Sequence, residues 1–193
     1  MTELTSRQRE IIWNAIHLID EKGIQGLTIK NLSQSMEFTE AAIYRHFKSK
    51  ADILAAIIEL FKNQTSKVIE EKKQSKDRSL AILESTLNNY SQTFTETPAI
   101  VSVIFAEEIF QNESALKNRL TEIIDANEQF FQEIIRRGQR AGEIRNDIDP
   151  ALVATNILGT FRLTVKKWKL HGFQYSLVNE TRRLTAYFQT VLS

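Results

Sequence analysis

Apolar residues recur along most of this chain at the three- and four-residue spacing of an amphipathic helix. Ile12, Ala15, Ile16 and Ile19 stand at i, i+3, i+4 and i+7 and form one apolar stripe. Gly23 follows this stripe, and glycine tolerates the positive φ that often ends a helix. The pattern therefore predicts a first helix over about 5–22 that ends close to this glycine.

Polar residues and prolines mark where further helices begin. Thr28 and Thr39 are candidate N-caps, because a threonine hydroxyl accepts the free N–H groups of a helix's first turn. Ser49-Lys50-Ala51-Asp52 has the form of a capping box. The sequence predicts nine helices, over about 5–22, 29–36, 40–47, 50–72, 78–95, 98–110, 114–140, 150–171 and 176–192.

The composition agrees with an all-α fold. Only 6 glycines and 2 prolines interrupt 193 residues, and 42% of the residues are hydrophobic. The absence of cysteine excludes disulfides, thiol nucleophiles and thiolate metal sites. No apolar run approaches the roughly 18 residues of a membrane span, and the N-terminal residues do not resemble a signal peptide. We therefore expect a soluble, cytoplasmic protein without membrane association.

The charge of the chain alone does not identify a partner. The net charge is +1, and residues 1–50 hold seven Lys or Arg residues against six Asp or Glu residues. A nucleic-acid partner is therefore neither required nor excluded by bulk charge, and the placement of the charges must decide.

One face of the predicted helix over 40–47 lacks large aliphatic side chains. Ala41, Tyr44, Arg45 and Lys48 stand at i, i+3, i+4 and i+7, roughly opposite Ile43. Small residues let a backbone approach a DNA groove, while hydroxyl and cationic groups reach phosphates and base edges. Two short helices joined by a tight turn are typical of a helix-turn-helix. We interpret this face as DNA-binding, and the alternative is a charged face that is only solvated.

The segment from Arg9 to about Leu60 resembles the N-terminal domain of the TetR family of bacterial transcriptional repressors. The matching residues are Gly23, "LTIKNLSQSM", "TEAAIYRHF" and "KSKADIL". The turn departs from the family pattern, because Glu37-Phe38-Thr39 stands where Gly-Val-Ser is usual. Glu37 therefore replaces a glycine that takes positive φ easily, and its carboxylate is expected near the path of DNA phosphates.

The resemblance implies DNA contacts for a defined set of positions. Contacts to the DNA backbone are implied for Thr28, Thr39, Tyr44, His46 and Lys50. Positions near base edges are Glu40, Ala41, Ala42 and Arg45, and Arg45 is the best candidate for binding a guanine. Lys30 and Lys48 are expected to be peripheral neighbours of phosphates.

The resemblance also implies a helix-turn-helix domain at 1–50 and a helical regulatory and dimerisation domain at 51–193. A pocket for an apolar or amphipathic ligand is expected to be lined by aromatic residues that also suit a plain core: Phe94, Phe105, Phe130, Phe131 and Phe161. Glu108, Asn127 and Asn156 are candidates for orienting a polar group of the ligand. The last two helices carry apolar stripes that suit either a dimer seam or packing within one subunit. The candidate dimer residues are Leu152, Ala154, Leu158, Gly159, Leu184, Tyr187, Phe188 and Val191.

These observations predict a homodimeric, sequence-specific repressor that binds a palindromic operator in double-stranded DNA and is released by a small effector. A DNA-binding or adaptor protein of the same fold that responds to a protein partner remains an alternative. A helical-bundle enzyme is a remote one, because His17 and Glu21 are the nearest approach to a metal pair and no phosphate loop or nucleophile elbow is present. We expect no enzymatic activity, no metal and no cofactor.

Overall fold

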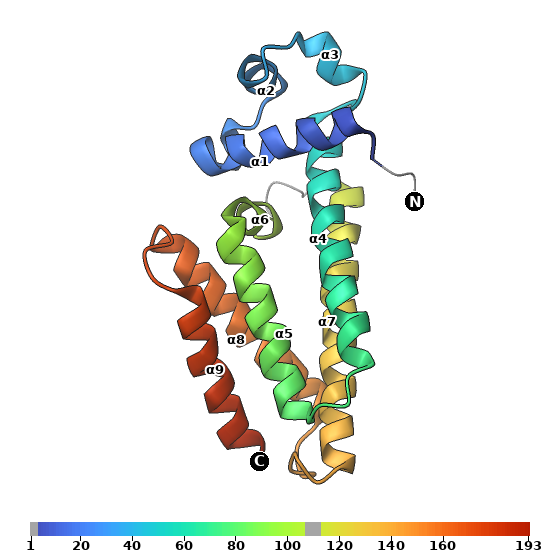
Figure 1. Cartoon of the computed structure of the whole chain (residues 1–193), viewed down its shortest axis with the longest axis vertical. Coiled ribbons are helices and arrows are strands. Elements are labelled where there is room, and N and C mark those ends of the chain that lie inside the picture. The colour runs from blue at the N-terminus through green and yellow to red at the C-terminus, as the bar shows by residue number, and fades with distance from the viewer. Residues whose placement is uncertain (1–3, 107–112) are drawn as a thin grey trace. The chain divides into compact units, whose positions relative to one another are not determined.

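The computed structural model describes residues 4–106 and 113–193, and this part of the chain forms nine helices and no strand (Figure 1). The helices are α1 (Ser6–Gly26), α2 (Ile29–Ser35), α3 (Glu40–Tyr44), α4 (Lys50–Lys73), α5 (Ser79–Glu96), α6 (Pro98–Ile104), α7 (Ser114–Arg140), α8 (Pro150–Leu170) and α9 (Leu177–Leu192). The predicted all-α class is confirmed. The third and sixth helices are shorter than predicted, and residues 107–110 of the predicted sixth helix lie outside the described residues. None of the described helices is long and apolar enough to cross a membrane.

The chain divides into two compact units. Unit 1 contains Met1–Lys62 and Thr97–Thr121, and unit 2 contains Asn63–Glu96 and Glu122–Ser193. The chain passes from one unit to the other within α4, between α5 and α6, and within α7. These boundaries differ from the predicted one after residue 50, and the functional division into 1–50 and 51–193 stays a prediction.

The first helix of unit 1 is capped by side chains that the sequence supplies locally. The Thr5 hydroxyl accepts the Gln8 N–H at 3.2 Å, and the Thr5 N–H donates to Gln8 Oε1 at 3.0 Å, which completes a capping box. Gly23 interrupts the helical geometry with φ 69° and ψ 172°, a combination that is nearly restricted to glycine. The predicted role of this glycine at the end of the first apolar stripe is thereby confirmed, although helical geometry resumes as far as Gly26.

Helix α1 packs against α2 and α6 within unit 1. Ile12, Ile19 and Leu32 are fully buried there. The Asp20 carboxylate of α1 accepts the backbone N–H of Ala99, in the first turn of α6, whereas Thr97 makes no side-chain cap. Burial raises the pKa of Asp20, partly against the opposing effects of His17 and the Ala99 hydrogen bond. One helix of the unit therefore supplies the N-terminal cap of another.

Unit 2 is built around α5, α8 and α9. Helix α9 packs against both α5 and α8, and Figure 1 shows α8 and α9 side by side. Phe130, Phe131 and Ile157 are fully buried in this unit. Gln189 of α9 also donates to the Glu84 carboxylate of α5 at 2.8 Å. Burial of apolar side chains is therefore the main stabilising contribution, and a polar contact aligns the two helices.

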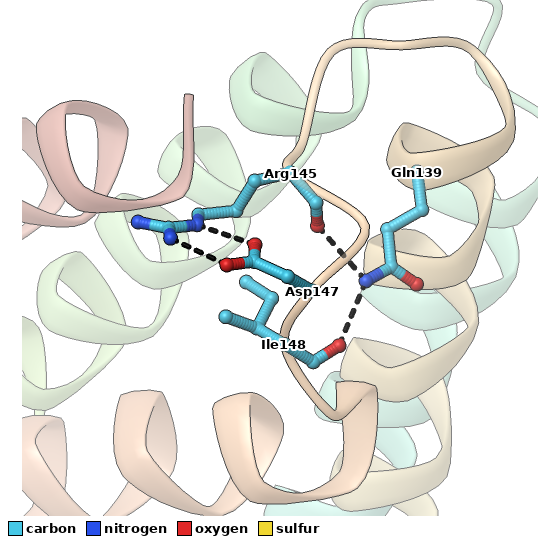
Figure 2. A network of polar contacts seen from close by, with 4 residues as sticks. All are labelled: Gln139, Arg145, Asp147 and Ile148. Carbon is cyan, nitrogen blue, oxygen red and sulfur yellow. Dashed lines mark hydrogen bonds and ion pairs between the residues drawn. The ribbon is translucent and has the colours of Figure 1, made fainter.

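A polar network orders the loop between α7 and α8 (Figure 2). The Gln139 amide donates to the carbonyl oxygens of Arg145 at 3.1 Å and Ile148 at 2.9 Å. The Arg145 guanidinium donates to both carboxylate oxygens of Asp147, at 2.7 and 2.6 Å. The Arg145 N–H donates to the carbonyl oxygen of Leu192 at 2.9 Å, so the ordered loop caps the C-terminal end of α9.

The turn between α2 and α3 is a Schellman motif with an unusual residue in its left-handed position. The Phe38 N–H donates to the Ser33 carbonyl at 2.8 Å, and the Glu37 N–H donates to the Gln34 carbonyl at 3.2 Å. Glu37 has φ 55°, a conformation that glycine adopts without a side-chain penalty. The turn therefore keeps a left-handed residue at position 37, and Glu37 carries the strain of that conformation.

We expect Glu37→Gly to raise the free energy of unfolding by roughly 0.5–1 kcal/mol. The left-handed conformation costs an ordinary residue about 1–2 kcal/mol, and the extra chain entropy of glycine offsets part of the gain. Urea denaturation followed by circular dichroism measures the change. Glu37→Ala is the matched control, because it removes the carboxylate but keeps the strained Cβ. Equal stabilisation by both variants would assign the effect to charge and contradict the strain argument.

Candidate nucleic-acid interface

Helix α3 is held in place by its caps and by the apolar residues beneath it. It has only five residues, Glu40–Tyr44, and the Thr39 hydroxyl accepts the Ala42 N–H at 3.2 Å. Ile43 is completely buried, and Phe47 is 6% exposed. These two side chains face inward, which leaves the opposite face of the helix directed away from the core.

This opposite face is accessible to solvent. Ala41, Arg45 and Lys48 are exposed, and the Tyr44 side chain is 49% exposed. Alanine adds little bulk. The hydroxyl group of Tyr44 and the cationic groups of Arg45 and Lys48 supply hydrogen-bond donors on the same side of the chain. The geometry meets the requirement for groove entry, which is a bare helix face flanked by donors.

The remaining candidates near this helix differ in exposure. Thr28, Lys30, Thr39 and Glu40 are exposed, whereas Ala42 and His46 are partly buried. The Thr28 hydroxyl accepts the Asn31 N–H at 3.0 Å, as the Thr39 hydroxyl does from Ala42. A capping threonine uses its oxygen as an acceptor, so its O–H group is still available to donate to a phosphate.

Lys50 makes a contact within the protein, and its predicted contact with the DNA backbone stays a prediction. Its ammonium group donates to the Ile24 carbonyl oxygen at 2.9 Å, and burial lowers the pKa of Lys50. The hydrogen bond joins the start of α4 to the last turn of α1. Ser49 and Asp52 complete this helix start, because Asp52 N–H donates to Ser49 Oγ at 3.2 Å and Lys48 N–H donates to Asp52 Oδ2 at 2.9 Å. Lys50 therefore fastens two helices of unit 1, a role that its sequence position did not indicate.

Several of the candidate effector residues gather inside unit 2. The rings of Phe94 and Phe161 are stacked with centroids 6.2 Å apart, and Tyr90 lies 6.5 Å from Phe161. The Tyr90 hydroxyl donates to Asn127 Oδ1 at 2.6 Å, and Asn127 Nδ2 donates to the Ile123 carbonyl at 2.7 Å. Burial raises the pKa of Tyr90, so its hydroxyl stays protonated and acts as a donor. Tyr90 was not predicted, although it stands one helical turn before Phe94.

The other candidates for a ligand site are distributed differently. Phe130 and Phe131 are buried in unit 2 with their rings edge to face, whereas Phe105 is partly buried and belongs to unit 1. Asn156 is exposed on α8, so its predicted place in an interior pocket is not supported. Glu108 lies outside the described residues. Among the residues that the structure describes, no group of three or more His, Cys, Asp or Glu side chains is placed to hold a metal ion.

The candidate dimer residues fall into two sets. Leu152 is 67% exposed and Tyr187 is 60% exposed, and Gly159 and Val191 are exposed as well. Leu158 and Leu184 are partly buried. Ala154 and Phe188 are instead buried inside unit 2, because they stand on the faces of α8 and α9 that pack within the unit. The partner-facing role predicted for these two residues is therefore corrected to a core role.

Two family models match overlapping parts of the chain. "Bacterial regulatory proteins, tetR family" matches residues 11–57, and "YsiA-like protein, C-terminal region" matches residues 54–188. The first covers the helix-turn-helix, and the second covers most of the remaining helices. Together they agree with the resemblance that the motifs of the N-terminal segment carry.

Similar proteins support the same fold over nearly the whole length. The fatty acid metabolism regulator protein of Bacillus subtilis is 25% identical over 92% of this chain and 91% of its own. The nucleoid occlusion factor SlmA of Vibrio vulnificus is 22% identical over 89% of this chain and 88% of its own. The solved structure of the fatty acid degradation regulator FadR from Bacillus halodurans has a TM-score of 0.82 at 17% identity, with 97% of each chain covered. The structure of FadR from Bacillus subtilis in complex with stearoyl-CoA has a TM-score of 0.76 at 23% identity, covering 98% of this chain and all of that one.

We expect Tyr90→Phe to lower the free energy of unfolding by about 1–3 kcal/mol. The substitution removes the donor to Asn127 and leaves a buried amide oxygen without its partner. A thermal melt measures the loss, with about 2–4 °C of Tm for each kcal/mol in a chain of this size. Tyr187→Phe is the control, because the exposed Tyr187 should change stability by less than about 0.5 kcal/mol. A Tyr90→Phe protein as stable as the parent would show that the buried pair adds nothing.

Proposed function

This chain belongs to the tetR family of bacterial regulatory proteins, and from this we infer that it is a DNA-binding transcriptional regulator and not an enzyme. We propose that it is a homodimeric repressor whose α3 face reads a palindromic operator. The observation that carries the proposal is the exposed face of Ala41, Tyr44 and Arg45 opposite the buried Ile43. The backbone and hydroxyl groups of this face would position the helix, and Arg45 would bind guanine O6 and N7.

The proposed palindrome follows from the proposed dimer. Leu152, Tyr187 and Val191 expose apolar surface on α8 and α9, and burial of such surface drives association. A two-fold dimer presents two copies of α3 with opposite orientation. Their centres would be about 34–36 Å apart when both enter the major groove on one side of the duplex.

We propose an effector with an acyl chain and a polar head. The support is twofold: a relative is a fatty acid metabolism regulator, and a structural neighbour was solved with stearoyl-CoA. Unit 2 of this chain offers the buried aromatics Tyr90, Phe94 and Phe161, which suit an apolar chain, with the Tyr90–Asn127 pair as adjacent polar groups. An effector of this kind would release DNA because it binds more tightly to the conformation that has low affinity for DNA.

A second candidate function has support from another relative. The similarity to the nucleoid occlusion factor SlmA favours, as this second candidate, a DNA-binding protein of the same fold that takes part in nucleoid occlusion. Such a protein needs no small effector, so the two candidates differ in whether an acyl compound stabilises the folded chain.

The DNA-binding proposal is tested by selecting duplexes from a random pool. We expect a palindromic consensus, and we expect Arg45→Ala to weaken binding by about 1–3 kcal/mol while relaxing one symmetric base-pair position. Lys48→Ala should weaken all duplexes alike and lower the salt slope by about 1 for each copy in the dimer. Arg136→Ala, an exposed substitution on α7, is the control for loss of positive charge. Recovery of no consensus by the parent protein would remove the proposal.

The effector proposal is tested by thermal shift with stearoyl-CoA. At a concentration about 100 times its Kd, a ligand that binds only the folded state adds about 2.7 kcal/mol and raises Tm by several degrees. Coenzyme A without the acyl chain is the control, and a chain-length series maps the apolar contribution. Gel shifts should show release of the selected duplex over the same concentration range. The absence of both effects would favour regulation by a protein partner.

A further inference from the structure

Arg7, in the first turn of α1, contacts the turn that leads into α3. Its guanidinium carbon lies 4.8 Å from the centroid of the Phe38 ring, close enough for a cation–π interaction. Phe38 is the residue directly before the Thr39 cap of α3. A cation that is distant in the sequence is therefore placed beside the start of the proposed recognition helix.

A second contact holds the same guanidinium. Arg7 Nη1 donates to Glu10 Oε2 at 2.5 Å, and both side chains are 48% exposed. This hydrogen bond takes one of the five N–H donors of the guanidinium, so a phosphate oxygen can accept others. The ring on one side and the carboxylate on the other restrict the rotamers of Arg7, which lowers the entropy that a further contact would cost.

Two acidic side chains flank the turn that Arg7 contacts. Glu37 and Glu40 are exposed on either side of Phe38 and Thr39, and a duplex that approaches α3 meets both carboxylates. The Debye length is about 10 Å at 0.1 M salt, so exposed charges that lie closer together than this are only partly screened. Arg7 packs on the residue between these carboxylates and offsets their repulsion of phosphate. The neighbouring Arg9 is used differently, because its Nε and Nη2 atoms both donate to the Leu4 carbonyl, at 3.1 and 2.8 Å.

We propose that Arg7, held between the Phe38 ring and the Glu10 carboxylate, is a phosphate-binding residue of the DNA interface. This inference rests on the proposed DNA binding and adds a contact from α1, outside the helix-turn-helix. Its chemistry is that of a phosphodiester, so it strengthens binding to all duplexes and reads no base. Glu10 positions Arg7 but also competes with the phosphate for it.

The test measures the Kd of the full dimer for its selected duplex from about 50 to 200 mM salt. Arg7→Gln should lower the salt slope by about 1.8 per dimer, which is about 0.9 for each lost phosphate contact, and should weaken selected and scrambled duplexes by the same factor. Glu10→Gln should tighten binding roughly two- to fivefold, because it removes a competing carboxylate worth at most about one exposed ion pair. Lys73→Gln, which removes a cation of an exposed pair with Glu70 in unit 2, should leave the slope unchanged.

The Arg7→Lys variant distinguishes a phosphate contact by Arg7 from a purely structural role in packing on Phe38. Lysine keeps the charge, so its salt slope should equal that of the parent even if the turn is less well packed. The inference is overturned if Arg7→Gln keeps the parent slope, or if Arg7→Gln and Arg7→Lys weaken binding equally without changing the slope. Failure of the parent to bind any selected duplex would remove the proposed function itself, whereas a bound parent with an unchanged Arg7→Gln variant removes this inference alone.

Discussion

The burial of Ile43 and Phe47 is the constraint on which the DNA-binding unit depends. A five-residue helix has almost no stability by itself, because nucleation costs more than so few hydrogen bonds return. Helix α3 therefore exists only as long as its inner face is packed and its ends are capped. The two faces of α3 therefore differ in role: the inner side chains pack in the core, and the outer side chains do not contribute to that packing. The identities of Ala41 and Arg45 are therefore not constrained by the core, and they can suit a contact outside the protein.

The turn before α3 shows how a local cost is tolerated when the surroundings determine the backbone. Two Schellman hydrogen bonds and the Thr39 cap fix the chain on both sides of Glu37, so the left-handed conformation persists without glycine. The Phe38 ring that follows is partly buried and stacks on Arg7. The departure from the usual Gly-Val-Ser turn thus changes the chemistry of the surface, with a carboxylate and an aromatic–arginine stack, while position 37 keeps a left-handed conformation.

The features that the sequence predicted well are those set by neighbouring residues. The caps at Thr28 and Thr39, the break at Gly23 and the inward Ile43 all follow from spacings of a few residues. The same is true of the starts of the helices in the part of the chain that the structure describes. The errors concern which face of a helix meets which neighbour. Ala154 and Phe188 share an apolar pattern with exposed neighbours, and a periodic stripe does not say whether its partner is the same subunit or another. The contacts of Lys50 with Ile24 and of Arg7 with Phe38 were not predicted, because they join residues 26 and 31 positions apart.

The contacts of α6 and α7 within unit 1 bear on how a regulator of this kind can respond to a ligand. Asp20 of α1 caps α6, and Arg119 of α7 pairs with Glu59 of α4, so both segments are fastened to the helices that carry α3. Two of the three places where the chain crosses between the units lie next to these fastened segments. An effector alters DNA affinity only through a conformation that it binds with different affinity. A displacement of α6 or of the start of α7 would either move α1 and α4 with it or break the Asp20 cap and the Arg119 pair. This is the route by which the proposed effector would change the support of α3.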